Sequence, residues 1–211
     1  MQKTMSASEK SLSESKLLSK AQRLLKHALG KDNEEKWQEQ YARGEWAWLR
    51  NLDELAHHSI LAGYFMRLKP HGSLLDMGCG EGILQESIPE TMYSKYVGVD
   101  FSEPIKLAAH KCTERTQFVV GDMNTYVPNE QFDAIVFNES IYYLNNPLKG
   151  LQRYAEYLKP DGIFLISIFI KDKHEEIWRQ IQSVFPPLDA VTVYNQKGTG
   201  WTCKVLTAPK R

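Results

Sequence analysis

The chain has 211 residues, of which 26 are Lys or Arg and 26 are Asp or Glu, so its formal net charge is zero. Hydrophobic residues make up 42% and charged residues 25%, as in ordinary globular domains, which excludes a largely disordered chain. The lack of a basic excess argues against a dedicated nucleic-acid-binding protein. We expect one globular domain with a short extension and no nucleic-acid partner.

Apolar runs and cysteines indicate the compartment in which the chain works. The longest apolar run, Ile163–Ile170, is too short to span a bilayer, and residues 1–20 lack the apolar core of a signal peptide. Cys79, Cys112 and Cys203 have no C-x-x-C spacing, which is typical of reduced thiols. The sequence therefore predicts a cytoplasmic protein without a membrane span.

Charge is unevenly distributed along the chain. Residues 1–31 hold seven Lys or Arg and two Glu, a net charge of +5, which leaves −5 for the remainder. Apolar residues recur over Leu12–Leu29 with a helical period, so we expect an amphipathic helix ending at Gly30. Such a basic helix can bind a membrane surface or a partner, or can pack on the domain with its lysines in water. We expect residues 1–31 to form a flexible basic extension.

Residues 32–72 are expected to form a helical cap. Helices are predicted over Asn33–Arg43 and Leu52–Leu68. His57 and His58 are adjacent on the second helix, where side chains point roughly 100° apart, so only one is expected to face a site. Helical metal ligands need a spacing of four residues, so we expect no metal site here.

From residue 73 to the C-terminus, short apolar runs alternate with helical stretches. The runs are Leu74–Met77, Tyr96–Val99, Phe118–Val120, Ala134–Phe137 and Ile163–Ile170, and the helical stretches are Ile83–Ser87, Glu103–Cys112 and Leu148–Leu158. Runs rich in Val, Ile, Leu and Phe are typical of strands buried on both faces of a parallel sheet. The alternation predicts a doubly wound α/β domain over residues 73–211.

The last part of the chain departs from this alternation. A helical stretch, His174–Val184, stops before Pro186 and Pro187, because proline lacks a backbone donor. Two strand-like segments follow, Ala190–Tyr194 and Trp201–Thr207, joined by about six residues, a length that suits antiparallel neighbours. The sheet is therefore predicted to end in an antiparallel hairpin.

A glycine-rich turn, G-x-G-x-G over Gly78–Gly82, connects the first expected strand to a helix. Glycine allows a sharp turn and the close approach of a ligand, and the helix start presents free N–H groups. Asp100 ends the second strand, where a carboxylate can accept both hydroxyls of a ribose. Asp122 follows the third strand, beside Met123, and could bind the edge of an adenine.

Each of these features has a simpler interpretation. The turn could be only a tight strand-to-helix connection, and each Asp could cap a helix or form a turn. Ligands of open α/β sheets bind outside the carboxyl ends of the strands. Three suitable elements at successive strand ends therefore favour a bound nucleoside.

The motifs, in this order, resemble those of the class I S-adenosylmethionine-dependent methyltransferases over residues 33–208. The matching stretches are Leu75–Gly82, Gly98–Ser102, Gly121–Met123, Phe132–Glu139 and Leu158–Gly162. The resemblance implies a seven-stranded, mostly parallel sheet with an antiparallel last strand, and S-adenosylmethionine as the cofactor. A nicotinamide-dependent oxidoreductase is the competing interpretation, but its G-x-G-x-x-G fingerprint needs a small residue where this chain has Ile83.

The resemblance also implies roles for individual residues. The methionine end of the cofactor falls to Asp76, Gly78, Cys79, Gly80 and Gly82, the ribose to Asp100, and the adenine to Phe101, Asp122 and Met123. Asn138 would lie near the sulfonium and the substrate. A W-x3-Y pattern ahead of the turn implies that Tyr41 contacts the cofactor and that Trp46 or Trp48 covers it, although tryptophans here could simply pack on the sheet.

The sequence offers several candidates for the residue that acts on the methyl acceptor. Methyl transfer needs alignment and desolvation, and it needs a base only when the acceptor must lose a proton. Candidates are Glu139, His57, His58 and Tyr142, each of which could instead be solvated or packed. The stretch after the fourth strand is loosely similar to nodulation-type N-methyltransferases, which favours a small-molecule amine over a hydroxyl. A non-catalytic module that binds the cofactor or a partner is the second functional class.

Overall fold

The computed structural model describes residues 31–209, so the expected helix Leu12–Leu29 lies outside the described residues. The chain divides into two compact units, one ending at Glu45 and the other beginning at Trp46. The described part of the first unit is α2 (Lys31–Ala42), which ends in a turn where Gly44 has a φ of 69°. A left-handed glycine is a common way to end a helix. The expected domain boundaries at residues 31 and 72 stay predictions.

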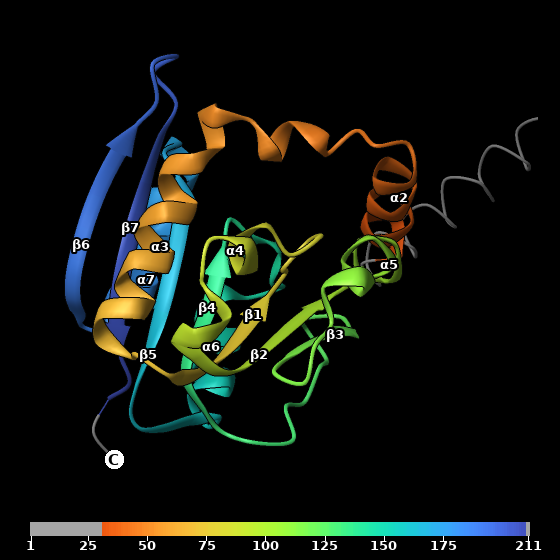
Figure 1. The fold of residues 1–211 in the computed structure, drawn as a ribbon. Helices are drawn as coiled ribbons and strands as arrows, with labels where there is room; N and C mark the ends of the chain where they lie inside the picture. Colours follow the sequence, from red (N-terminus) through yellow and green to blue (C-terminus); the bar gives the residue numbers. More distant parts are fainter. Residues whose placement is uncertain (1–30, 210–211) are drawn as a thin grey trace, which may run out of the picture. The chain divides into compact units, whose positions relative to one another are not determined.

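The second unit is built on a seven-stranded sheet with the strand order β3-β2-β1-β4-β5-β7-β6 (Figure 1). The strands are β1 (Gly72–Met77), β2 (Tyr93–Asp100), β3 (Thr116–Val120), β4 (Phe132–Asn138), β5 (Leu158–Phe169), β6 (Pro187–Tyr194) and β7 (Gly200–Thr207). The first five strands pair in parallel, and β7 runs antiparallel to both of its neighbours. The predicted fold class, including the antiparallel last strand and the terminal hairpin, is confirmed.

The strands extend beyond the apolar runs that predicted them. β5 begins at Leu158, five residues before the expected Ile163, and Leu158 pairs with Phe132 across an irregularity in the ladder. The apolar runs mark only the buried centre of each strand, whereas backbone pairing continues into the exposed ends.

Helices cover both faces of the sheet. They are α3 (Leu55–Leu68), α4 (Ile83–Glu86), α5 (Ser102–Ala108), α6 (Pro147–Ala155) and α7 (Asp172–Gln182), with short 3-10 turns at Ala47–Arg50, Leu52–Glu54, Glu90–Met92, Ala109–Lys111 and Ile141–Tyr143. The expected helix Leu52–Leu68 thus starts as a 3-10 turn, and Glu103–Cys112 becomes regular helix only to Ala108. α6 starts at Pro147 because Asn146 caps it, its side chain accepting the N–H of Lys149 at 2.9 Å.

Two buried clusters lie on opposite faces of the sheet. Leu74 belongs to the cluster that contains Phe65 of α3, and the next residue, Leu75, belongs to the cluster that contains Tyr154 of α6 and Trp178 of α7. Alternate residues of a strand point to opposite faces, so one strand supplies both cores. In Figure 1, α3 crosses in front of β5 and β7. Within residues 31–209, no helix is long and apolar enough to cross a membrane.

Candidate functional site

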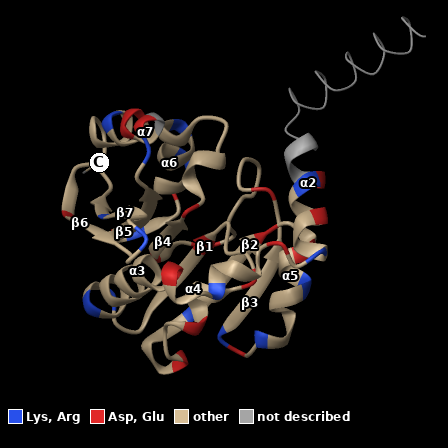
Figure 2. Cartoon of the chain, turned by 90° about the horizontal axis from the view of Figure 1, so that it is seen from above, with Lys and Arg blue, Asp and Glu red and all other residues tan. Residues whose placement is uncertain are grey.

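Polar residues gather where the parallel strands end. Asp76 lies one residue before the end of β1, Asp100 ends β2, Asp122 follows β3, and Asn138 ends β4. Carboxyl ends of parallel strands meet at one edge of a sheet, so these residues share that edge. Figure 2 shows acidic residues around the labels of β1 and β2.

The turn after β1 has the backbone that its glycines were expected to supply. Gly78, Gly80 and Gly82 have φ values of 75°, 55° and 78°, in the left-handed region that other residues avoid. The N–H groups of Gly78 and Cys79 donate to the carbonyl oxygen of Val99 at 2.8 and 3.2 Å. These bonds fasten the turn to the end of β2.

Gly78 also lies where no side chain would fit. A Cβ at this position would be 2.6 Å from Cβ of Ser140 and 2.9 Å from Cε of Met123. The Ser140 hydroxyl donates to the carbonyl oxygen of Met77 at 2.5 Å. The loops after β1, β3 and β4 therefore meet around this one glycine.

Asp76 is buried beside the turn, with one oxygen paired and the other not. Tyr96 donates its hydroxyl to Oδ2 at 2.5 Å. Oδ1 is buried and has no hydrogen-bond partner among the described residues. Burial raises the pKa of Asp76 to about 7, and the Tyr96 bond opposes this increase. A buried acceptor left without a donor is costly, so Oδ1 marks a place for a polar ligand.

Asp100 joins the end of β2 to the glycine turn. Its Oδ2 accepts the N–H of Gly80 and its Oδ1 accepts the N–H of Phe101, both at 2.7 Å. Burial raises the pKa of Asp100 to about 6, and the two N–H bonds work against that shift. A carboxylate has about four acceptor positions, so Asp100 can still accept hydroxyl groups of a ligand. The structure brings together Asp76, Asp100 and the turn, as the sequence predicts.

The loop after β3 is held in place by α6. Arg153 donates to the carbonyl oxygens of Met123 and Asn124 at 2.6 and 2.7 Å, and Tyr154 donates to that of Met123 at 2.8 Å. Asp122 Oδ1 accepts the backbone and side-chain N–H groups of Asn124 at 2.8 and 3.1 Å. Asp122 therefore forms a turn, the simpler of its two interpretations, and its contact with adenine stays a prediction.

Both histidines of α3 reach Asn138, so the expectation that only one would face the site is wrong. His57 Nδ1 lies 2.7 Å from Asn138 Oδ1, and His58 Nδ1 lies 2.9 Å from Asn138 Nδ2. The two rings pack together with centroids 4.3 Å apart, and the His57 ring packs on Trp201. The two Cβ atoms point in different directions, but rotation about the side-chain bonds turns both rings toward Asn138.

Glu139 is half-buried, and its carboxylate accepts three hydrogen bonds, so it is not freely solvated. Oε1 accepts the hydroxyl of Ser167 at 3.0 Å, and Oε2 accepts the N–H of Phe169 at 3.1 Å and the hydroxyl of Tyr142 at 3.3 Å. Glu139 has a φ of 55°, a conformation that is uncommon outside glycine and clusters at functional sites. Burial raises the pKa of Glu139, and these donors oppose that shift.

Aromatic rings form one wall beside Glu139. The Tyr142 ring stacks on His174, with centroids 4.9 Å apart and planes 9° apart, and meets Phe169 and Tyr143 edge to face. His174 Nδ1 donates to the carbonyl oxygen of Phe169 at 2.9 Å. Burial raises the pKa of Tyr142, which stays a neutral hydroxyl. Sequence reasoning missed His174 because it lies on α7 without any motif.

A charged cluster fastens the segment before α3 to the glycine turn. Arg50 donates twice to Glu86, at 2.8 and 3.1 Å, and once to Glu81 at 3.0 Å. Lys111 pairs with Glu86 and donates to the carbonyl oxygen of Glu81 at 2.5 Å. The sequence carries no local signal for this cluster, because Arg50 and Glu86 are far apart in the chain.

Four further residues were predicted to lie at the site. Cys79 is buried, and burial raises the pKa of its thiol well above the usual value, so it is a packed neutral side chain. Trp46 and Trp48 precede α3 with ring centroids 5.9 Å apart. Tyr41 belongs to the first unit, so its contact with a cofactor stays a prediction. Across residues 31–209, no three His, Cys, Asp or Glu side chains are grouped to hold a metal ion.

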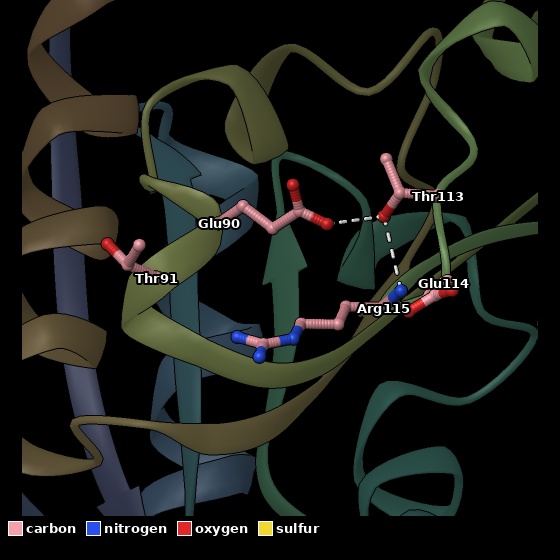
Figure 3. Close-up of a pocket in the computed structure, with 5 residues that line it drawn as sticks. All are labelled: Glu90, Thr91, Thr113, Glu114 and Arg115. Atoms are coloured by element: carbon pink, nitrogen blue, oxygen red, sulfur yellow. Dashed lines mark hydrogen bonds between the residues drawn. The ribbon is translucent and has the colours of Figure 1, made fainter.

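A surface hollow of about 360 Å³ lies away from this site (Figure 3). It is lined by Glu90, Thr91, Thr113, Glu114 and Arg115. These residues precede β2 and β3, so the hollow opens at the amino ends of the strands, opposite the carboxyl edge. The Thr113 hydroxyl donates to Glu90 at 2.5 Å and accepts the N–H of Arg115. None of the predicted site residues lines this hollow.

Comparison with known proteins points to one kind of domain. A family model described as a methyltransferase domain matches residues 41–204. The chain is 32% identical over 122 residues to malonyl-[acyl-carrier protein] O-methyltransferase 2 of Ilyobacter polytropus, a match that covers 56% of this chain and 47% of that protein. It is 31% identical over 104 residues to the ubiquinone biosynthesis O-methyltransferase of Haemophilus ducreyi, covering 44% of each. The chain spans about half the length of these relatives.

Solved structures share the fold at low identity. The 1,6-didemethyltoxoflavin-N1-methyltransferase of Burkholderia thailandensis superposes with a TM-score of 0.74 and 21% identity, over 87% of this chain and 90% of that one. The N-methyltransferase NodS of Bradyrhizobium japonicum gives a TM-score of 0.69 and 18% identity, over 78% and 92% of the two chains. Both of those proteins were solved with S-adenosylhomocysteine bound.

Proposed function

Because the chain belongs to the class I S-adenosylmethionine-dependent methyltransferases, we propose that it transfers a methyl group from S-adenosylmethionine to an amine of a small molecule. The observation that carries this proposal is the pair of carboxylates at the glycine turn. Asp100 is bonded to Gly80 within the turn, and Asp76 presents a buried oxygen without a partner among the described residues.

The residues at this edge suit the cofactor. The unpaired Oδ1 of Asp76 needs a donor, and the left-handed glycines of the turn bring backbone beside it without side chains in the way. The proposed holders are Asp76, Gly78, Cys79, Gly80 and Gly82 for the methionine end, Asp100 for the ribose, Phe101, Asp122 and Met123 for the adenine, and Tyr41 and Trp46 as covering residues. When bound, S-adenosylmethionine supplies a methyl group on a positively charged sulfur.

The charges next to Asn138 favour an amine as the acceptor. Within residues 31–209, the side chains of Asn138 and Glu139 form hydrogen bonds with His57, His58, Tyr142, Ser167 and Phe169, and none of these is Lys or Arg. A carboxylate attracts a protonated amine and repels an anionic acceptor. Glu139 would hold the amine, accept its proton and so free the lone pair that attacks. Tyr142 would line this pocket.

A hydroxyl acceptor is the second candidate, favoured by the names of the sequence relatives, which are O-methyltransferases. In that case His57 or His58, beside Asn138, would act as the base. Matched pairs of small amines and alcohols, incubated with labelled S-adenosylmethionine and analysed by mass spectrometry, separate the two candidates. Methylated amines alone would support the proposal, and methylated alcohols alone would replace it with the second candidate.

The cofactor proposal is tested by thermal unfolding with S-adenosylmethionine, S-adenosylhomocysteine and NAD in parallel. A ligand at about 100 times its Kd adds about 2.7 kcal/mol, which should raise the Tm by about 5–10 °C for a chain of this size. We expect the two sulfur ligands to give this shift and Asp100→Ala to abolish it. Asp189→Ala, an exposed aspartate on β6, is the matched control. A shift with NAD alone, or with none of the three, would contradict the proposal.

A further inference from the structure

The amide group of Asn138 has two orientations related by a 180° rotation, which exchanges Oδ1 and Nδ2. The neighbouring hydrogen-bond donors and acceptors determine which orientation is favoured. Oxygen and nitrogen of an amide have nearly the same shape, so the hydrogen-bond network has to assign them. As placed, Oδ1 faces His57 Nδ1 at 2.7 Å and Ser167 Oγ at 2.8 Å, and Nδ2 faces His58 Nδ1 at 2.9 Å. Three separate neighbours argue that the amide is turned the other way.

Ser167 has one hydroxyl proton and two acceptors competing for it. Its Oγ lies 2.8 Å from Asn138 Oδ1 and 3.0 Å from Glu139 Oε1, and it also accepts the N–H of Glu139 at 3.0 Å. One proton cannot serve both oxygens. With the amide turned, its NH₂ donates to Ser167, and the hydroxyl proton goes to Glu139. Ser167 then accepts two bonds and donates one, which is its full capacity.

His57 gives the second argument. Its Nε2 lies 3.3 Å from Oε2 of Glu54, and a carboxylate only accepts, so Nε2 carries a proton. With Asn138 as placed, Nδ1 would need a second proton to face the amide oxygen. With the amide turned, Nδ1 accepts from the NH₂ group, and one ring proton, directed at Glu54, satisfies both neighbours.

His58 gives the third argument. Burial lowers the pKa of His58 to about 3, so the ring carries one proton. As placed, Nδ1 accepts from the amide and the proton sits on Nε2, which is buried and without a partner in the described chain. With the amide turned, the proton sits on Nδ1 and donates to the amide oxygen. No buried N–H is then left without an acceptor, which removes an expensive defect.

We propose that the Asn138 amide lies with its nitrogen toward His57 and Ser167, and that Ser167 thereby directs its proton to Glu139 and keeps Glu139 ionised as the proton acceptor of the reaction. Ser167 and Asn138 are positioning residues in this scheme, and Glu139 is the catalytic residue. The inference rests on the proposed amine acceptor only in its last step, the use of the ionised carboxylate.

In this step, proton transfer to Glu139 precedes methyl transfer to the amine. The protonated amine gives one proton to Glu139. The nitrogen lone pair then forms the new bond to the methyl carbon, and the electrons of the carbon–sulfur bond stay with the departing S-adenosylhomocysteine. Among the described residues, the titratable side chains that face this network are Glu54, His57, His58, Glu86, Tyr142, Tyr143, His174 and Cys203.

The amide orientation is tested directly by nitrogen NMR of histidine-labelled full-length chain, without any ligand. His57→Gln and His58→Gln identify the two rings. Near neutral pH we expect His57 protonated on Nε2 only and His58 on Nδ1 only. A doubly protonated His57, or a His58 protonated on Nε2, would overturn the proposal. This outcome does not depend on cofactor binding or turnover, so it is independent of the proposed function.

The role of Ser167 is tested by the titration of Glu139, read as the infrared carbonyl band that Glu139→Gln removes. A hydrogen bond to a charged group is lost in Ser167→Ala, so the band should persist to a pH higher by about one unit. Ser73→Ala is the matched control. The Ser73 hydroxyl donates to the carboxylate of Asp133 at 2.9 Å, near the amino ends of β1 and β4 and so away from the site. An unmoved band in Ser167→Ala, or an equal shift in Ser73→Ala, would contradict the assigned role.

Discussion

At the scale of single residues, two glycines with nearly the same backbone have different surroundings. Gly78 has a φ of 75° and is crowded by Ser140 and Met123, whereas Gly198 has a φ of 80° and nothing within 4 Å of its Cβ position. Both need the left-handed conformation, but only Gly78 also needs the absence of a side chain. Comparing the two separates backbone strain from crowding.

We therefore expect Gly78→Ala to cost more stability than Gly198→Ala. The second change should cost about 1–2 kcal/mol from backbone strain alone. The first adds the displacement of two loops and should cost roughly 1–3 kcal/mol more, with loss of S-adenosylhomocysteine binding. Urea unfolding and calorimetry on both variants measure this, and equal costs in the two variants would mean that Gly78 is needed only for its φ.

Asp76 makes the stability of the protein depend on pH. Its pKa is raised to about 7 from 3.8, so the folded state holds this proton more tightly than the unfolded chain. The stability that it contributes is complete below about pH 4 and is lost as the pH rises through about 7. Asp76→Asn cannot ionise, so its stability relative to the natural chain should increase by roughly 2–4 kcal/mol over this range.

Urea unfolding at a series of pH values measures this difference. Asp100, whose pKa is raised to about 6, titrates in the same range, but it is present in both chains. A constant difference for Asp76→Asn would contradict the raised pKa.

At the scale of elements, Arg50 connects the 3-10 turn Ala47–Arg50 to α4. The turn itself has no side-chain cap and no buried residue. Glu81 and Glu86, which accept from Arg50, lie within the glycine turn and on α4. These ion pairs therefore connect the segment that carries Trp46 and Trp48 to the glycine turn and to α4.

Arg50→Ala should loosen this segment without unfolding the domain. Because Arg50 is 41% exposed, the stability cost should be below about 1 kcal/mol. We expect hydrogen exchange to become faster in residues 46–54 and S-adenosylhomocysteine to bind more weakly. Arg179→Ala breaks a comparable exposed pair with Glu176 on α7 and should change neither. Unchanged exchange in Arg50→Ala would mean that the segment is held by its own packing.

At the scale of the whole molecule, the described members of both buried clusters lie within residues 60–208. Residues 1–30, which carry six Lys or Arg and two Glu, lie outside the described residues. The described residues of the second unit pack on both faces of the sheet.

Deleting residues 1–30 should leave the Tm within about 2 °C and preserve the shift given by S-adenosylhomocysteine, because every described member of the two clusters follows residue 59. Thermal unfolding of the shortened chain measures both. A fall in Tm of more than about 5 °C would show that the removed segment packs on the domain. Loss of partner binding with unchanged turnover would favour a working surface in residues 1–31.

Local patterns account for most of what the sequence could predict. Five apolar runs located β1 to β5, because burial on both faces selects Val, Ile, Leu and Phe, and the two strand-like segments after Pro187 located β6 and β7. Their ends were missed, as at Leu158, because backbone pairing leaves no mark on side-chain type. The glycine turn and Asp100 were found from spacing alone, because each closes a strand and their contact spans only 20 residues.

The sequence by itself determined the α/β class, the turn at Gly78–Gly82 and the carboxylates at the strand ends, since each depends on neighbouring residues. Only the tertiary structure decided which side chains surround Asn138. His57 comes from 81 residues earlier in the chain and Ser167 from 29 residues later, and no local pattern relates them. Strand order and helix packing bring them within hydrogen-bond distance, so the protonation of the site is a property of the folded chain.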